Sequence, residues 1–480
     1  MHNYTKIITG AFCFAALGCT TDGNREKQRT DDRPNIIIVF TDDQGYGDVG
    51  IFGHPTISTP HLDQMAIEGQ KWTSFYTAAS VCTPSRAGLL TGRLPIRSGM
   101  CSDNRRVLFP DSKGGLPQSE ITIATALRNV GYRTAAIGKW HLGHLPEFLP
   151  ASHGFESYFG IPYSNDMDRV DHTDQFTLAE EERFEAFNVP LMRDTEIIER
   201  PADQRTITRR YTEEAVAKIR EYKNEPFFIY LAHSMPHIPL FRDEAFKNVS
   251  LAGFYGDVIE EIDWSMGQIL KALKEEGIDQ NTLVVFTSDN GPWHTYRTHG
   301  GTAGLLRGAK GGTFEGGFRV PTIFWWPAKI KSGVVRDMAT TMDLMPTICQ
   351  ITGTPLPADR VYDGYDLTPL ITGTGKSERD YVIYYRGQKV YAARKGNFKA
   401  HFIIQNEYGT QTAHPITNPL VELNNDPTYL EVPLLYNLSI DPSEKFNVAD
   451  EHPEVIEEIR RMVEEHVAGV VPVTNQLELR

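Results

Sequence analysis

The stretch NIIIVFTDDQGYGD, residues 35–48, decides the fold of this chain. Its continuous apolar run predicts a strand that is buried on both faces, as the strands of a parallel sheet are. The aspartates and glycines that follow predict a loop at the carboxyl end of that strand. The stretch NTLVVFTSDNG, residues 281–291, repeats the design much later in the chain. Both patterns indicate parallel strands that carry polar groups to one edge of an open α/β sheet.

Two pairs of oxygen-bearing side chains stand at these strand ends. Asp42 and Asp43 follow the first run, and Asp289 and Asn290 follow the second. For either pair alone, capping of a turn or a helix is the simpler interpretation. Because the pair recurs in the same strand-end context, the pattern favours a site for a hard divalent cation, calcium or magnesium, over a site for a soft metal.

Further segments alternate strands with helices. The stretches RTAAIGKWHLG, residues 133–143, and PFFIYLAHSMPHIP, residues 226–239, each predict a strand followed by a polar cluster. Residues 257–277 predict a helix with one apolar face, formed by Val258, Ile259, Ile262, Met266, Ile269, Leu270 and Leu273. This alternation predicts an α/β sandwich.

The pattern of predicted secondary structure changes towards the end of the sequence. From about Tyr365 short β-rich pieces follow one another, and a final helix is expected near Pro453 to Val470. The pattern predicts a smaller α+β subdomain with an antiparallel sheet at residues 365–480, after a large α/β domain at residues 33–364. The length of 480 residues, which exceeds a usual single domain, agrees with such a division.

The charge balance limits the possible partners. The chain has 48 basic and 62 acidic side chains, which give a net charge of −14. This balance argues against a nucleic-acid-binding surface and against long-range attraction of polyanions. An anionic substrate would therefore need cations that are gathered locally.

Residues 1–19 predict an export signal. Lys6 supplies a weak positive charge, and the apolar run after it is too short to span a bilayer. The segment ends in ALGC and resembles a bacterial lipoprotein cleavage box, which predicts lipidation of Cys19, although Ala16 stands where leucine is usual. A plain secretory signal is the alternative. Either interpretation predicts an exported protein, in the bacterial periplasm or at the cell surface, and residues 20–32 would form a polar tether to any lipid anchor.

Outside the export signal, the cysteines are Cys82, Cys101 and Cys349. Their wide spacing fits neither a disulfide framework nor a zinc site. Cys82 opens the stretch CTPSRAGLLTGR, which predicts a helix whose exposed amides favour anions at its start. A buried small hydrophobe and a thiolate nucleophile activated by histidine are the alternatives. Neither alternative explains the proline and the arginine that follow the cysteine.

This motif, Cys-x-Pro-x-Arg followed by AGLLTGR, resembles the signature of type I sulfatases, in which the cysteine is oxidised to Cα-formylglycine (3-oxoalanine). Other blocks also resemble the family and occur in its order: FTDDQGYGDVG, GKWHLGH, GIPYSND, HSMPHIP, FTSDNGP, LLRGAKGGTFEGGFRVP and KAHF. On these motifs the chain is identified as a member of the family, close to its arylsulfatase A and N-acetylgalactosamine-6-sulfatase branch. The resemblance implies an alkaline-phosphatase-like sandwich, with a large mixed, mostly parallel sheet between helices, and a catalytic domain at residues 33–364.

The modification explains why a cysteine stands at position 82. A serine that attacked a sulfate ester would become a stable sulfate ester itself, whereas an aldehyde hydrate has two hydroxyls on one carbon. One hydroxyl attacks sulfur, and the other later expels sulfate and restores the aldehyde. Cys82 is therefore interpreted as the precursor of the nucleophile, and a formylglycine-generating maturation enzyme is implied as a partner.

The resemblance also implies a metal site and a catalytic set. One divalent cation, taken to be Ca²⁺, would be bound by Asp42, Asp43, Asp289, Asn290 and the hydrated residue 82. The ion would lower the pKa of the attacking hydroxyl and hold sulfate oxygens. Arg86 and Lys139 would steady the hydrate and the sulfate, and His141 would transfer the proton that drives elimination.

Three further residues match positions that contact the substrate in the family. His237 matches the general acid that protonates the departing alkoxide. Lys310 matches a cation that pairs with sulfate and can share that task, and Ser164 matches a polar sulfate contact. A lone buried histidine is usually structural, and GGTFEGG beside Lys310 could be only a turn, but the family context favours function.

The motifs specify sulfate more clearly than the group that carries it. His294, Arg297 and His299 could contact a sugar or could be solvated loop residues. In TYLEVPLLYNLS, residues 428–439, a histidine of the arylsulfatase A pattern is missing, which argues against identical substrate recognition. Export suggests a sulfated carbohydrate, such as an oligosaccharide from an algal or host polysaccharide, attacked from its end.

Two other functions share some of these features. A phosphate or phosphonate monoester hydrolase of the alkaline phosphatase superfamily would have the fold, but typically with a serine or threonine nucleophile and more histidine ligands for two metals. The single-ion ligand set and Cys82 argue against it. A non-catalytic sulfated-glycan-binding surface protein should have lost part of the catalytic set, none of which is missing.

Overall fold

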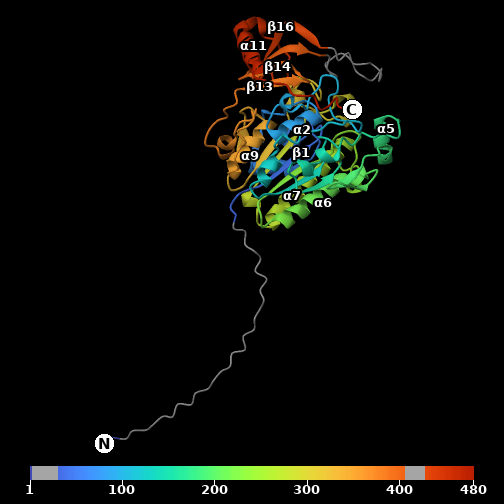
Figure 1. Cartoon of the computed structure of the whole chain (residues 1–480), viewed down its shortest axis with the longest axis vertical. Coiled ribbons are helices and arrows are strands. Elements are labelled where there is room, and N and C mark those ends of the chain that lie inside the picture. The colour runs from blue at the N-terminus through green and yellow to red at the C-terminus, as the bar shows by residue number, and fades with distance from the viewer. Residues whose placement is uncertain (3–30, 406–426) are drawn as a thin grey trace.

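The computed structural model describes residues 1–2, 31–405 and 427–480 (Figure 1). Within them lies a 10-stranded mixed sheet with the strand order β11-β2-β10-β9-β1-β8-β4-β5-β6-β7. Its strands are β1 (Asn35–Thr41), β2 (Gln70–Trp72), β4 (Arg133–Gly138), β5 (Ser157–Gly160), β6 (Leu191–Arg193), β7 (Glu196–Glu199), β8 (Phe227–Ala232), β9 (Thr282–Ser288), β10 (Thr322–Trp325) and β11 (Gly333–Val335). A separate short parallel pair joins β3 (Phe75–Tyr76) to β12 (Ala339–Thr340).

The centre of the large sheet is parallel, and its register aligns the strand ends. Strands β9, β1, β8, β4 and β5 run in the same direction. Thr41, the last residue of β1, pairs with Ser288, the last residue of β9. Ala232 at the end of β8 pairs with both Phe40 and Gly138. The loops that follow these strands therefore leave the sheet at the same level, on the same edge.

Helices cover both faces of the sheet. Ile37 and Val39 of β1 face a core with α1 (Pro60–Glu68), α6 (Ile207–Tyr222) and α7 (Gly253–Glu275). Ile36, Ile38 and Phe40 face the other core, with α2 (Cys82–Thr91), α4 (Ile123–Arg128) and α9 (Leu344–Thr352). In Figure 1, α9 lies to the left of β1, and α6 and α7 lie below it. The apolar face predicted for residues 257–277 is buried in α7, and the predicted α/β sandwich is confirmed.

The remaining helices are short. They are α3 (Pro95–Ser98), α5 (Gln175–Glu180), α8 (Glu315–Phe318) and α10 (Thr368–Thr372). In the described part of the chain, no helix has both the length and the apolar character that crossing a membrane requires. The predicted signal, the lipidation site Cys19 and the tether as far as residue 30 lie outside the described residues. Cys82, Cys101 and Cys349 are all free thiols, as their spacing predicts.

A second, antiparallel sheet forms near the C-terminus, as the sequence predicts. It contains β13 (Tyr381–Arg386), β14 (Lys389–Lys395), β15 (Phe398–Ile404) and β16 (Thr428–Asn437) in sequence order. The final helix α11 (Pro453–Ala468) packs against β14 and β15 and lies beside this sheet in the red part of Figure 1. Buried Ile456 and Ile459 of α11 share a core with Ala393 and Ala400 of the sheet.

A fully buried charge network joins α8 and β3 to the antiparallel sheet near the C-terminus. Glu315 in α8 accepts hydrogen bonds from the Tyr76 and Tyr384 hydroxyls, both at 2.7 Å, and from Lys399 Nζ at 3.0 Å. Lys399 also lies 3.1 Å from Glu444, whose carboxylate bonds the Glu315 amide at 2.7 Å. Although burial pushes the pKa of Glu315 up, Lys399 and nearby arginines outweigh that effect and hold this pKa well below its usual value.

Replacement of Lys399 by methionine is expected to destabilise the protein by about 3–5 kcal/mol, because it leaves two buried carboxylates without their shared cation. Urea unfolding monitored by fluorescence measures this loss. Lys395→Met is the matched control, since Lys395 pairs with Glu458 at 2.7 Å on the surface and should matter little. Equal losses of unfolding free energy in the two variants would contradict the conclusion that this buried ion-pair network stabilises the protein.

Candidate active site

The residues that the sequence predicts for the site come from consecutive strands of the parallel centre. Each of these strands ends just before a polar segment that carries site residues. The remaining site residues lie in α2 and in the loop before α8. The residues concerned are Asp289 and Asn290 after β9, Asp42 and Asp43 after β1, His237 after β8, Lys139 and His141 after β4, Ser164 after β5, Cys82 and Arg86 in α2, and Lys310 before α8. All of them except Lys310 are buried, and Lys310 is partly buried, with 8% of its side chain exposed.

Cys82 is the first residue of α2, and its side chain faces the acids. Val81 before it is extended, and Pro84 lies in the first turn, where a proline costs no helical hydrogen bond. The Cys82 sulfur lies 3.5 Å from Asp42 Oδ1. Burial raises the pKa of the Cys82 thiol, and the opposing charges of Lys139 and Lys310 are too weak to reverse the shift. The thiol is therefore protonated at neutral pH, which disfavours the thiolate-nucleophile interpretation.

The acids of the cluster are each paired with a cation. Lys139 Nζ donates to Asp42 Oδ2. Arg86 donates from two nitrogens to Asp289 Oδ2, at 2.8 and 3.1 Å. Lys310 Nζ lies 2.7 and 2.8 Å from the two carboxylate oxygens of Asp43. The site thus concentrates positive charge locally, as an acidic chain that binds an anion requires.

Burial and these neighbours move the carboxylate pKa values in different directions. Burial pushes the pKa of Asp42 up, but Lys139, His237 and Arg86 outweigh it and keep the pKa well below its usual value. For Asp289, burial and the adjacent Asp42 raise the pKa to about 7 against the opposing Arg86. Acids that repel one another in this way gain from a multivalent cation placed between them.

The donor atoms fit a hard divalent cation. Ligand atoms of Asp42, Asp43, Cys82 and His237 all lie within 4.8 Å of one another. Asn290 Nδ2 donates to Asp43 Oδ1 at 2.7 Å, whereas the buried Asn290 Oδ1 has no hydrogen-bond partner among the described residues. An orphaned amide oxygen beside carboxylates is the kind of group that calcium or magnesium accepts as a ligand. Asp289 also lies close, since its Oδ1 accepts the Asp43 amide at 3.1 Å.

A chain of polar contacts leads from the acids to His237. Lys139 Nζ donates to Ser164 Oγ at 3.0 Å, and Ser164 Oγ lies 3.5 Å from His237 Nε2. The same nitrogen lies 3.6 Å from Asp43 Oδ2, and His237 Nδ1 lies 2.5 Å from the carbonyl oxygen of the next residue, Ile238. Burial and Lys310 hold the pKa of His237 well below its usual value. The imidazole is therefore neutral, with Nε2 turned towards the cluster.

His141 lies beside the start of α2. Its Nε2 bonds the Leu108 carbonyl at 2.9 Å, and its own carbonyl accepts from Thr83 Oγ1 at 3.0 Å. Burial and Lys139 keep the pKa of His141 well below its usual value, and its Nδ1 has no hydrogen-bond partner in the part of the chain that the structure describes. A neutral ring with a free Nδ1 lone pair can accept a proton.

Two of the three loop residues that the sequence offers as sugar contacts meet on the ring of Phe176. Arg297 is exposed and lies over the Phe176 ring, 5.8 Å from its centre. His299 packs between Phe176 and Phe254, in the wall of a separate cavity of about 430 Å³. His294 is half-buried beside them in sequence.

Trp293 was not predicted from the sequence as a site residue, but it contacts two residues of the predicted site. The centre of its ring is 5.4 Å from that of His237, and Lys310 Nζ stands 4.1 Å above it. The side chain is half-buried. A tryptophan directly after the metal-strand motif was the available signal, because an exposed aromatic face beside a catalytic group is a common sugar contact surface.

Comparison with known proteins gives the same family for both parts of the chain. A sulfatase family model matches residues 34–354, and a model of the C-terminal region of aryl-sulfatase matches residues 377–480. Arylsulfatase A from Homo sapiens is 40% identical over 446 residues, which cover 89% of this chain and 87% of that relative. N-acetylgalactosamine-6-sulfatase from Mus musculus is 37% identical over 478 residues, which cover 93% and 88%.

Solved structures resemble the whole architecture. The PsFucS1 sulfatase from Pseudoalteromonas sp. superposes with a TM-score of 0.78 at 29% identity, and the match covers 91% of this chain and 90% of that one. The structure of Ps i-CgsB in complex with k-i-k-neocarrahexaose gives a TM-score of 0.75 at 27% identity, with 93% and 94% covered.

Proposed function

This chain belongs to the sulfatase family and is a sulfuric ester hydrolase, and we propose that it desulfates a sulfated carbohydrate with a formylglycine hydrate at position 82. One observation carries the proposal. The Cys82 thiol is buried, protonated and held at the start of a helix against the acid cluster, where a thiolate nucleophile is disfavoured. A precursor awaiting oxidation has no need of an acidic thiol. The aldehyde hydrate would supply one hydroxyl to attack sulfur and a second to expel sulfate.

The surrounding side chains divide the remaining work. Asp42, Asp43, Asp289 and Asn290 would bind Ca²⁺ together with residue 82, and the ion would stabilise negative charge on the attacking oxygen. Arg86, which spans Asp289 and the Lys139 carbonyl, would fix the acids around residue 82. His141, with its free Nδ1, would take the proton released when sulfate is expelled.

The substrate side of the site lies around His237. Lys139, Ser164 and Lys310 would hold the sulfate oxygens in place of their present contacts, which join Lys139 to Ser164 and Lys310 to Asp43. His237 Nε2 would protonate the departing oxygen of the sugar. The pKa of a neutral buried imidazole rises when an anion binds beside it, so the sulfate itself would favour the protonated form that this step needs.

The choice of a carbohydrate rests on relatives and on the sequence. Among the similar proteins, one is named for N-acetylgalactosamine 6-sulfate and one was solved with a carrageenan-type oligosaccharide. We further propose export through residues 1–19, lipidation of Cys19, a periplasmic or surface location, a maturation enzyme that oxidises Cys82, and a division into residues 33–364 and 365–480.

The proposed function is tested by measuring sulfate release from a panel of regiochemically defined sulfated sugars, and phosphate release from the matching phosphate esters. Release of phosphate without release of sulfate would contradict it.

Calcium is expected to stabilise the protein. At about 100 times its dissociation constant, a ligand specific to the folded state adds about 2.7 kcal/mol to the unfolding free energy. Thermal unfolding with calcium, with magnesium and with a chelator measures the effect and the ion preference. Asn290→Ala should lose most of the shift, because it removes the orphaned Oδ1.

Asp48→Asn is the matched control for this experiment. Asp48 is buried on the loop after β1, but its carboxylate is satisfied by the Tyr255 hydroxyl at 2.6 Å and the Thr302 amide at 2.7 Å. The calcium shift should persist in this variant. No calcium shift in the wild type, with full activity in chelator, would rule out the metal site.

A further inference from the structure

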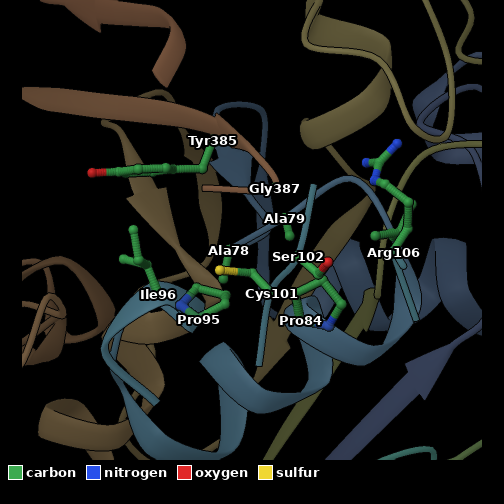
Figure 2. A pocket seen from close by; sticks show the side chains of 11 residues that line it. Ala78, Ala79, Pro84, Pro95, Ile96, Cys101, Ser102, Arg106, Tyr385 and Gly387 are labelled. Carbon is green, nitrogen blue, oxygen red and sulfur yellow. The ribbon is translucent and has the colours of Figure 1, made fainter. Parts of the chain in front are cut away.

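Arg106 lies between the chain segments that carry His141 and Lys310. Two residues after it, Leu108 accepts a bond from His141 Nε2 at 2.9 Å and donates its amide to Thr83 Oγ1 at 3.2 Å. On the other side, a Cβ on Gly311, next to Lys310, would stand 3.7 Å from an Arg106 terminal nitrogen. Arg106 also lines the small pocket in Figure 2, where its guanidinium lies at the right of the view, apart from Cys101 and Ile96.

Arg106 forms no hydrogen bond or ion pair with any side chain in residues 31–405 and 427–480. Asp103, the acid whose charge it feels most, accepts the Gln388 amide at 2.8 Å instead. A second guanidinium, that of Arg386, donates Nε to the Gly311 carbonyl at 3.2 Å. Burial and this neighbouring charge lower the pKa of Arg106 to about 9, so that Arg106 remains charged at neutral pH.

Three other arginines, two near the site and one next to Arg106 in the sequence, pair with carboxylates. Arg86 bonds Asp289 at 2.8 Å, and Arg319 lies 3.4 Å from Glu315. Arg105, the direct neighbour of Arg106, pairs with Asp111. Arg106 and Arg386 are partly buried and form no ion pair with a carboxylate of the described residues, in a chain whose net charge is −14. A cation that has lost water without gaining a counter-charge is destabilising, and an anionic ligand would compensate it.

We propose that Arg106, supported by Arg386, binds a second anionic group of the substrate while the scissile sulfate lies at Lys139, Ser164 and Lys310. This inference rests on the proposed function, since it takes the centre at residue 82 as the place of the first sulfate. The planar fork of a guanidinium suits the two oxygens of a sulfate or a carboxylate. The substrate class is thereby narrowed to saccharides with two nearby negative charges, either a disulfated sugar or a sulfated sugar linked to a uronic acid.

Competition against 4-nitrophenyl sulfate turnover tests the inference. The competitors are N-acetylgalactosamine 6-sulfate, the 4,6-disulfate of the same sugar, and the 6-sulfated sugar linked to glucuronic acid. The first has one charge, and the other two add a sulfate or a carboxylate, which distinguishes the two sources of the second anion. The ratio of inhibition constants within one variant cancels any change in general activity.

In the wild type at least one doubly charged competitor should bind about 10- to 100-fold more tightly than the singly charged one, the gain of one charge-assisted contact. Arg106→Gln should bring that ratio close to one, and Arg386→Gln should reduce it. Arg105→Gln, the matched control, should keep the wild-type ratio. A wild type without preference, or an Arg106→Gln variant that keeps the preference, would overturn the inference. A wild type that releases no sulfate from any of these esters would instead refute the proposed function.

Discussion

Cys82→Ser is expected to fold normally and to lose steady-state sulfate release by roughly 10⁴-fold or more, the scale of losing a nucleophile outright. A serine side chain nearly matches the volume of cysteine in this buried position and can still bond Asp42. Its single hydroxyl can attack sulfur once but cannot expel sulfate afterwards. The variant should therefore stop after one turnover, with a sulfo group on residue 82.

Sulfate release by ion chromatography and the intact mass of the protein measure both parts of this result. Cys101→Ser is the matched control, because Cys101 is also a buried free thiol, with its pKa raised to about 12 by burial, and it lines the pocket in Figure 2. It should keep its activity. Continuous turnover by Cys82→Ser would refute the claim that two hydroxyls on residue 82 are needed for repeated sulfate release.

His237→Ala is expected to show an effect that depends on the leaving group. A general acid contributes about 10²- to 10⁴-fold when the departing oxygen is a poor leaving group. A sugar alkoxide needs the proton, whereas 4-nitrophenolate leaves without one. The ratio of kcat/KM between wild type and variant should therefore be large for a sulfated sugar and small for 4-nitrophenyl sulfate.

His233→Ala controls for the loss of a buried imidazole after the same strand. His233 directly follows β8 and bonds Ser265 Oγ at 3.2 Å. It should change both substrates equally. If His237→Ala lowered kcat/KM equally for both substrates, His237 would not be the general acid and would act only in binding.

The sequence was sufficient to predict the fold class and the gathering of the acids. Apolar runs that end in paired oxygen ligands identify parallel strands, and in such a sheet the carboxyl ends meet at one edge. The register confirms the alignment, since Thr41 pairs with Ser288 directly before Asp42 and Asp289. The start of α2 at Cys82 also follows from local sequence, because extended Val81 and early Pro84 favour a helix beginning there.

The partners within the site could not be predicted, because they depend on side-chain directions that no local pattern encodes. Arg86 could have faced any of the acids, and it bonds Asp289. His299 carries the same chemistry as His237 but packs between phenylalanines. Trp293 and Arg106 match none of the motifs that guided the sequence analysis, and their positions emerge only when distant loops meet around Lys310. Their roles, like those of the predicted catalytic residues, stay predictions until variants are assayed.

The most direct measurement is mass spectrometry of the tryptic peptide Trp72–Arg86 from active protein of the native host. We expect the side chain at position 82 to carry an aldehyde in place of the thiol, in protein that releases sulfate over many turnovers. An untouched thiol in a preparation of full activity would contradict the account, because the buried, protonated sulfur next to Asp42 cannot perform the two steps alone.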